Sequence, residues 1–339
     1  MLYLDNIAAL TFWRSVSNPR QTMQEARPVG DIAGCALSSD SFETQIGRLP
    51  SWLPRHLMVS DGRDRHCKSR IGYSVYSGPL PARSFYEIAP GICVASPELV
   101  FVQMCCELDL PLLLKLGCEL CGTYAHDVDA QACDMPPRYN RDPATDLATL
   151  QRYVGQASSL RGVKTARVAL PLLLEGSASA KETELALALS LPRRYGGYGT
   201  PKPLMNQEIE FDHAAREVAQ RSCARADLCW PEQKVDVEYD SIQWHADVCS
   251  MNSDKSRANA LAHMGYRVIF VTHQQMRDQR LFDVLAKDIA RALGMRPRGD
   301  RAPDYAKRTA LREAFRQAGS SAVFRVAGHT AAEPRYSNF

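Results

Sequence analysis

Residues 226–245 have the sequence ADLCWPEQKVDVEYDSIQWH, and this stretch decides the fold of the C-terminal half of the chain. From residue 235 to residue 240, two valines and a tyrosine alternate with three acids, which is the period of a half-buried strand. Residues 226–230 form another short apolar run, and Pro231-Glu232-Gln233 between the two runs is typical of a hairpin connection. The stretch therefore predicts two antiparallel strands with acids on one face of the second.

Helices and one further strand are expected on both sides of this hairpin. Ser179-Ala180-Lys181-Glu182 is a capping box that starts a helix over about 180–190. After the hairpin, residues 252–264 predict a helix, the β-branched run 266–272 a buried strand, and 281–293 an amphipathic helix. The order helix, hairpin, helix, strand, helix predicts an α/β core.

Three carboxylates of the hairpin are candidates for chemistry. Asp227 lies in the first strand, and Glu238 and Asp240 share one face of the second, so the three side chains converge where the strands lie side by side. Such a cluster is stable at a water-facing edge, or where it holds a hard divalent cation such as Mg²⁺. Spacing leaves both interpretations open.

Three residues that follow the hairpin add to this cluster. His245 comes seven residues after Glu238, where it could take a proton from a water molecule near neutral pH. Asp254 and Arg257 open the next helix, and Arg257 either contacts a phosphate or pairs with Asp254 one turn away. The acids of the hairpin together with these residues indicate a functional site more specifically than any one of them does alone.

These residues carry a resemblance to a known family. Residues 226–245 together with DKSRANALAHMGYRVIFVT (254–272) resemble a bacterial domain-of-unknown-function group related to the very-short-patch repair (Vsr) endonucleases, within the PD-(D/E)xK nuclease superfamily. The match covers about 175–295. It implies a restriction-endonuclease-like core, in which a central mixed sheet is flanked by helices, and hydrolysis of DNA phosphodiester bonds.

The resemblance also implies a role for each matching residue. Asp227 and Glu238 would hold Mg²⁺ or Mn²⁺, Asp240 would help to position the ion, and His245 would be the general base. Glu182 matches the acid of the first helix, although its capping-box position explains it equally well.

This chain departs from the family pattern at two positions. The usual Lys two residues after the Glu is absent, which leaves His245 or Lys234 to supply proton chemistry or charge. Ser241 stands where the family has Gly, and it narrows the approach of DNA to the strand. The expected contacts to substrate are Arg257, Lys234 and Ser241.

The N-terminal residues 1–150 predict a small α+β module. Short strands are expected in 70–78 and 84–96, and Ser96-Pro97-Glu98 predicts a helix start. The run from Leu49 to about Gly122 is similar to the portion that precedes this nuclease domain in abortive-infection antitoxin-like (AbiEi-like) proteins. That weaker resemblance implies recognition of DNA or of a partner protein.

Charge is distributed unevenly along the chain. The total of 41 Lys+Arg against 38 Asp+Glu gives only +3, whereas residues 296–325 carry eight basic and three acidic residues, a net of +5. The predicted organisation is therefore a module over 1–150, a Vsr-like domain over 151–295 and a basic helix or tail over 296–339. The positive charges of this last segment could contact the phosphates of a nucleic acid.

Composition limits the class of protein. The 339 residues are 23% charged and 45% hydrophobic, which excludes disordered, collagen-like and coiled-coil chains. No run of 18 apolar residues and no secretory signal occurs, so we expect no membrane span and a cytoplasmic location. The eleven cysteines are then expected as buried thiols. For Cys118 and Cys121 two interpretations stay open, packing within a helix or binding of zinc.

We therefore expect a Mg²⁺-dependent DNA endonuclease that acts in DNA repair or in defence against phage and mobile elements. The alternative is a catalytically inactive DNA-binding regulator, or an antitoxin of an abortive-infection system, that retains the nuclease fold. DNA is the expected partner in both cases, joined in the second by a cognate toxin or another partner protein.

Overall fold

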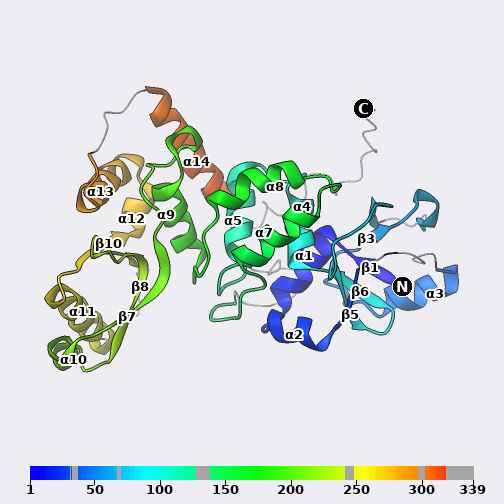
Figure 1. Ribbon diagram of the computed structural model, residues 1–339, viewed down its shortest axis with the longest axis horizontal. Helices are drawn as coiled ribbons and strands as arrows, with labels where there is room; N and C mark the ends of the chain where they lie inside the picture. Colours follow the sequence, from blue (N-terminus) through cyan, green and yellow to red (C-terminus); the bar gives the residue numbers. More distant parts are fainter. Residues whose placement is uncertain are drawn as a thin grey trace. The chain divides into compact units, whose positions relative to one another are not determined.

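The computed structural model describes residues 1–30, 32, 37–66, 70–126, 138–240, 248–296 and 302–317. The chain forms two compact units, residues 1–173 and residues 174–315 (Figure 1). Among the described helices, none is long and apolar enough to cross a membrane.

A six-stranded mixed sheet organises the first unit. The strands lie in the order β2-β5-β6-β1-β3-β4, and β1 pairs in parallel with β6, so that Tyr3 lies opposite Cys93, 90 positions later in the sequence. The N-terminal strand thus becomes a central strand of the sheet. The strand bounds are β1 (Leu2–Leu4), β2 (Arg27–Val29), β3 (His56–Val59), β4 (Gly72–Val75), β5 (Phe85–Ala89) and β6 (Ile92–Ala95).

Helices pack beside this sheet in the first unit. As expected from the sequence, Ser96 caps α4, because its hydroxyl oxygen accepts a hydrogen bond from the amide of Leu99. Gly162 separates α7 from α8 with φ of 88°, and a Cβ there would lie 2.3 Å from the carbonyl oxygen of Val102. The helices are α1 (Asn6–Ser15), α2 (Pro19–Glu25), α3 (Ser39–Gly47), α4 (Pro97–Met104), α5 (Leu110–Leu120), α7 (Leu147–Gln156) and α8 (Val163–Ala169), with short 3-10 turns at Gly62–Asp64 and Leu170–Leu172.

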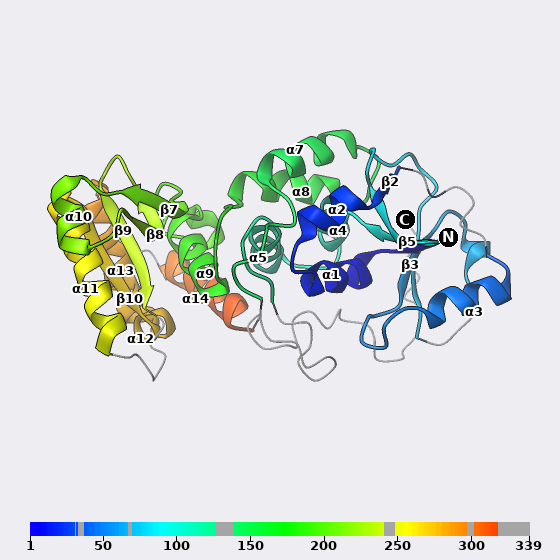
Figure 2. The same cartoon turned by 90° about the horizontal axis from the view of Figure 1, so that it is seen from below.

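A four-stranded mixed sheet organises the second unit. Its order is β10-β9-β8-β7, with antiparallel pairing between β7 and β8 and between β8 and β9, and parallel pairing between β9 and β10. The chain enters this sheet from α9 and crosses from β9 to β10 through α11 (Figure 2). The bounds are α9 (Ala180–Ser190), β7 (Leu204–Glu210), α10 (His213–Ala219), β8 (Cys223–Trp230), β9 (Val235–Asp240), α11 (Val248–His263), β10 (Arg267–Thr272), α12 (His273–Arg277), α13 (Gln279–Ala292) and α14 (Ala302–Gln317).

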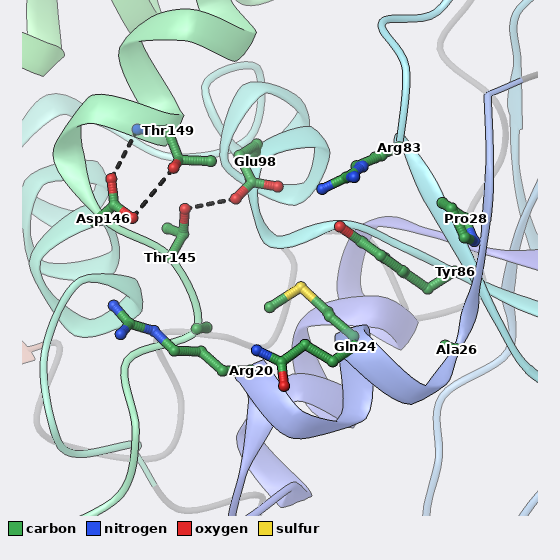
Figure 3. Close-up of a pocket in the computed structure, with 12 residues that line it drawn as sticks. Arg20, Gln24, Ala26, Pro28, Arg83, Tyr86, Glu98, Thr145, Asp146 and Thr149 are labelled. Atoms are coloured by element: carbon green, nitrogen blue, oxygen red, sulfur yellow. Dashed lines mark hydrogen bonds between the residues drawn. The ribbon is translucent and has the colours of Figure 1, made fainter.

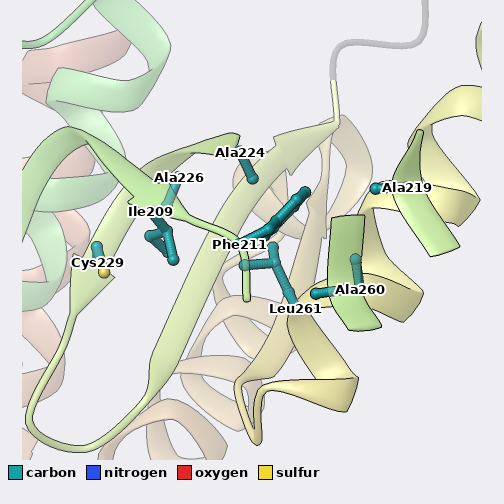
Figure 4. Packing of buried hydrophobic residues seen from close by; sticks show 9 residues of the cluster. Ile209, Phe211, Ala219, Ala224, Ala226, Cys229, Ala260 and Leu261 are labelled. Carbon is teal, nitrogen blue, oxygen red and sulfur yellow. The ribbon is translucent and has the colours of Figure 1, made fainter. Parts of the chain in front are cut away.

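Small side chains let α10 and α11 approach the sheet closely. Ala224 and Ala226 of β8 lie in one buried cluster with Ala260 and Leu261 of α11, and Phe211 fills the space between them (Figure 4). Burial of such a cluster stabilises the unit by about 25 cal/mol for each Å² of apolar surface removed from water. The cluster fixes α11 against β8, which matters for the site described below.

The basic C-terminal segment includes a helix that packs within the second unit. In α14, Arg308 is only 2% exposed, its Nε lies 3.3 Å from Asp283 Oδ1, and its guanidinium lies 5.0 Å from the centre of the Tyr198 ring. Arg312 lies 4.2 Å from the centre of the Phe282 ring and donates a hydrogen bond to Gln279. These two cations therefore support packing as well as contributing to the local charge.

Most regular elements expected from the sequence are present. The α/β class is confirmed, as are the hairpin, the helix over 180–190 and the strand and helices that follow it. The expectation of a half-buried β9 is wrong, because Val235 to Glu238 are buried on both sides of the strand. Strand β7 has no counterpart in the sequence analysis. Helix α7 spans the predicted boundary at residue 150, and both α7 and α8 belong to the first compact unit, which ends at Leu173.

Candidate functional site

Strands β8 and β9 bring Asp227 and Glu238 together. The pairs Cys229 with Asp236 and Leu228 with Val237, continued by one residue, place Asp227 opposite Glu238. Directly opposite residues of an antiparallel pair point to the same side of the sheet. The amide of Tyr239 donates a hydrogen bond of 2.9 Å to Oδ2 of Asp227, which orients that carboxylate toward β9.

Asp236 is a further carboxyl group at this site, and it is fully buried. It lies two residues before Glu238 on the same side of β9, and its exposed fraction is 0%. No described N–H or O–H group donates to either of its oxygens, or to Oε1 of Glu238. The two carboxyl groups contact each other, so a proton shared between them is the hydrogen bond that this arrangement allows.

Arg257 of α11 supplies the positive charge of the site. Its guanidinium donates a hydrogen bond of 3.1 Å to Oε2 of Glu238 and another of 3.0 Å to the carbonyl oxygen of Arg225. The ion pair is partly buried, with side-chain exposures of 20% for Arg257 and 8% for Glu238. Helix α11 is thereby tied to both strands of the hairpin.

Glu182 contributes to the site from α9 and also caps that helix. Its amide donates to the hydroxyl of Ser179, and its Oε2 accepts hydrogen bonds from the amide of Ala178 and from Asn206 Nδ2, at 3.0 and 2.7 Å. The same carboxylate is close enough to Asp227 to raise that residue's pKa. Both roles considered from the sequence are thus compatible with its position.

Burial makes these acids hold their protons unusually strongly. Burial first, and then repulsion by Glu238 and Glu182, raises the pKa of Asp227 to about 7. Burial and the contact with Asp236 raise the pKa of Glu238 to about 8, while Arg257 opposes this rise. The pKa of Asp236 is raised by burial to about 6. At neutral pH the three carboxyl groups are therefore only partly ionised. A bound cation would increase their negative charge by displacing their protons.

This electrostatic arrangement predicts the effect of Asp236→Asn on stability. Because the pKa of Asp236 is about 6 when folded and near 3.8 when unfolded, the folded state loses stability as the pH rises from about 4 to 6. At pH 8 the substitution should raise the free energy of unfolding of the second unit by about 1–3 kcal/mol, and this gain should shrink toward pH 4. Urea unfolding of both proteins at several pH values measures the difference. Glu210→Gln, at an exposed acid on β7, is the control and should show no such gain. If the difference in free energy of unfolding between Asp236→Asn and the unsubstituted protein did not vary with pH, the raised pKa of Asp236 would be contradicted.

The other residues proposed from the sequence lie at the end of β9, in the turn before it, or outside the described residues. Asp240 is exposed at the end of β9, paired in register with Thr272 of β10. Lys234 donates a hydrogen bond of 2.9 Å from Nζ to the carbonyl oxygen of Met264, at the end of α11. His245 and Ser241 lie outside the residues that the structure describes, as does the side chain of Asp254.

Three residues at this site were not predicted as site residues from the sequence: Asp236, Arg225 and Asn206. Alternation along β9 already placed Asp236 on the side of Glu238, so that pattern could have included it in the site. Arg225 precedes Asp227 by two residues, and its side chain is exposed on the same side of β8. Asn206 gave no signal, because β7 itself was not predicted.

Asp227 and Glu238 are the residues here that could hold a metal. Each uses one oxygen in a described hydrogen bond, to Tyr239 N and to Arg257, and Oε1 of Glu238 is buried without a donor. Two carboxylates with water and phosphate oxygens suit Mg²⁺, which keeps much of its hydration. Within the described ranges, no set of three or more His, Cys, Asp and Glu side chains is arranged to hold a metal ion.

Cys118 and Cys121 lie at one end of α5. Cys118 is a residue of the helix and Cys121 is its C-cap, and both are buried and outside disulfides. Their placement agrees with packing within a helix. Cys133, one of the ligands considered with them for zinc, lies outside the described residues.

Comparison with known proteins finds two distant relatives. The chain is 28% identical over 145 residues to "Uncharacterized protein MT2308" and, equally, to "Uncharacterized protein Rv2248", from two strains of Mycobacterium tuberculosis. Each match covers 42% of this chain, and the chain spans about half (49%) of the length of these curated relatives. No family model matches the chain, and no solved structure matches it significantly.

Proposed function

We propose that the second unit is a Mg²⁺-dependent DNA endonuclease with a PD-(D/E)xK core. One observation carries the proposal: an acid-bearing helix, α9, is followed by a sheet in which neighbouring strands β8 and β9 present Asp227 and Glu238 to each other. Helix α11 then leads to β10, which pairs in parallel with β9. This is the order of elements that the Vsr-like resemblance implies.

The residues of the chain have distinct tasks in this proposal. Asp227 and Glu238 would hold the ion, which when bound stabilises negative charge on the phosphate and makes a water molecule more acidic. Tyr239 orients Asp227 through its amide, and Arg257 holds Glu238 in place through its ion pair. His245 would accept the proton of the attacking water, and Asp240 would lie at the open end of the site.

Substrate contact is proposed for cations that border the acids. Arg225 is exposed on the side of β8 that bears Asp227, so its guanidinium is placed to contact a phosphate beside the scissile one. Lys234 and Ser241 stay candidates for contact with DNA from the sequence. We also propose a cytoplasmic location, where DNA is accessible and cysteines stay reduced.

Incubation of the purified full-length chain with supercoiled plasmid tests the enzyme proposal directly. We expect conversion to the nicked or linear form in Mg²⁺ or Mn²⁺, and none in EDTA, because the acids alone cannot stabilise charge on the phosphate. Gel electrophoresis measures the products. Cleavage that persists in EDTA, or an absence of cleavage with either metal, would contradict the proposal.

A second candidate function is a DNA-binding regulator or antitoxin that retains this fold without catalysis. It is favoured by the ion pair between Arg257 and Glu238, since a guanidinium already neutralises one of the two carboxylates that would hold a metal. This candidate predicts salt-dependent DNA binding without nicking under any divalent metal. A cognate toxin would be its protein partner, which co-purification from the native host would identify.

A further inference from the structure

Asn206 of β7 connects an acid of α9 to the strands that carry the candidate metal site. The residues on either side of it in β7 pair with Leu228 and Ala226 of β8, so Asn206 lies beside Asp227 in the sheet. Its side-chain amide reaches α9, where Nδ2 donates a hydrogen bond of 2.7 Å to Oε2 of Glu182. One asparagine therefore joins β7 to the acid that α9 brings close to Asp227.

The backbone at Asn206 is unusual for a strand. Its φ is 51°, in the left-handed region, although β7 continues on both sides of it from Leu204 to Glu210. Asparagine tolerates this conformation better than most residues that have a side chain. Glycine would tolerate it equally well but could not donate to Glu182. The position therefore favours a residue that combines this backbone tolerance with an amide donor.

The start of α9 is capped without Asn206. The amide of Glu182 donates a hydrogen bond of 3.2 Å to the hydroxyl of Ser179, and Oε2 of Glu182 accepts one of 3.0 Å from the amide of Ala178. These two bonds satisfy the capping arrangement of the helix. The bond from Asn206 is a second one to the same oxygen, so its effect is to fix the direction of the carboxylate.

The other oxygen of Glu182 stays available. Oε1 accepts no hydrogen bond from a described residue, and it is accessible to water. The charge of Glu182 raises the pKa of Asp227, so the two carboxyl groups are close to each other. Mg²⁺ keeps several water molecules when one or two carboxylates bind it, and an acid beside those ligands can accept a hydrogen bond from such a water.

We propose that Asn206 is a positioning residue of the candidate metal site and that it acts through Glu182. Its amide holds the carboxylate of Glu182 beside Asp227 and leaves Oε1 to accept a hydrogen bond from a water molecule of the ion. The role rests on the proposed function in one respect, namely that Asp227 and Glu238 hold this ion. Loss of such an outer partner typically changes metal affinity by about 10- to 100-fold.

Binding of Mn²⁺ to the full-length chain, measured by electron paramagnetic resonance without DNA, tests this role. The relevant binding is the part that Asp227→Asn removes. We expect Asn206→Gly to weaken it about 10-fold, and to raise the Mg²⁺ concentration for half-maximal nicking by a similar factor. Glycine accepts φ of 51°, so the variant should keep its thermal midpoint. A merely structural role would lower the folded fraction and leave the ion affinity of the folded protein unchanged.

Glu182→Gln shows whether Asn206 acts through Glu182. Residues that act as one unit give effects that do not add. Asn206→Gly should therefore weaken Mn²⁺ binding in the unsubstituted protein and cause little further loss in the Glu182→Gln protein. Equal losses in the two backgrounds would overturn the proposed role.

Two matched controls lie in the first unit. Asn140 is exposed and has φ of 53°, so Asn140→Gly makes the same change in the same backbone conformation. Glu98 is a buried glutamate beside a pocket of about 450 Å³, and its Oε1 accepts a hydrogen bond from the hydroxyl of Thr145 (Figure 3). Thr145→Val removes a donor from this other glutamate. Both controls should leave Mn²⁺ binding unchanged.

The outcomes separate this role from the nuclease activity. Unchanged Mn²⁺ affinity in Asn206→Gly would overturn the role of Asn206, even if nicking depended on Mg²⁺ and Asp227 as proposed. The absence of any Mn²⁺ binding that depends on Asp227 would overturn it as well. Weaker Mn²⁺ binding by Asn206→Gly in a protein that never nicks DNA would support the role and contradict the proposed activity.

Discussion

Asp227→Asn and Glu238→Gln are each expected to slow Mg²⁺-dependent nicking of supercoiled DNA by about 10²–10³-fold. Each substitution removes one of two carboxylates that would hold the ion, and a metal contributes several kcal/mol to stabilising charge on the phosphate. A loss of about 3–4 kcal/mol corresponds to this fold change. Initial rates of plasmid nicking, measured at saturating Mg²⁺ and pH 8, give the comparison.

The same variants should stay folded, which separates this loss of activity from unfolding. Burial raises the pKa of both carboxyl groups, so a neutral amide removes a charge that destabilises the folded state at pH 8. Thermal midpoints should equal or exceed that of the unsubstituted protein. Glu210→Gln, at an exposed acid on β7, should retain full activity. Equal nicking by either site variant would place the catalytic centre elsewhere.

Gly197→Ala is expected to destabilise the second unit by about 3 kcal/mol or more. A Cβ at this position would lie 1.9 Å from the carbonyl oxygen of Leu191 and 2.5 Å from its carbonyl carbon. Both atoms belong to the backbone at the end of α9, so the clash cannot be relieved by turning a side chain, and α9 or the loop must move. Urea unfolding, followed by circular dichroism, measures the loss.

Gly199→Ala is the matched control in the same loop. Gly199 has φ of 72°, but nothing lies within 4 Å of an added Cβ, so only backbone strain of about 1 kcal/mol is expected. Equal losses for the two variants would show that close packing against Leu191 is not the reason for glycine at position 197. Close packing against Leu191 thus explains the glycine at position 197.

Local signals explain which elements of the second unit could be predicted. The capping box of Ser179 and Glu182 fixes the start of α9, and the proline-containing turn fixes the hairpin. Strand β7 was not predicted, because its residues do not alternate regularly between apolar and polar. Leu204, its first residue, is exposed, and Asn206 has φ of 51°. Its place in the sheet depends on pairing with β8, which is a tertiary contact.

The candidate site was only partly predictable for a related reason. Alternating acids in β9 are typical of a water-facing strand, and nothing in the sequence shows that α9 and α11 come close enough to bury Asp236 and Glu238. Likewise the sequence offered Arg257 either a phosphate or Asp254 on its own helix, and not Glu238, since spacing reveals neighbours within a helix but not across to a sheet. In the first unit, β1 has three residues, and its central position depends on pairing with the distant β6.

Helix α14 has a practical consequence for any shortened version of this protein. The buried side chains of Arg308 and Arg312 cover the rings of Tyr198 and Phe282, on which they lie. A protein that ended before residue 302 would expose both rings to water and leave Asp283 without its ion pair with Arg308. Fragments meant to isolate the second unit should therefore extend through this helix, because its removal would expose apolar surface and favour aggregation.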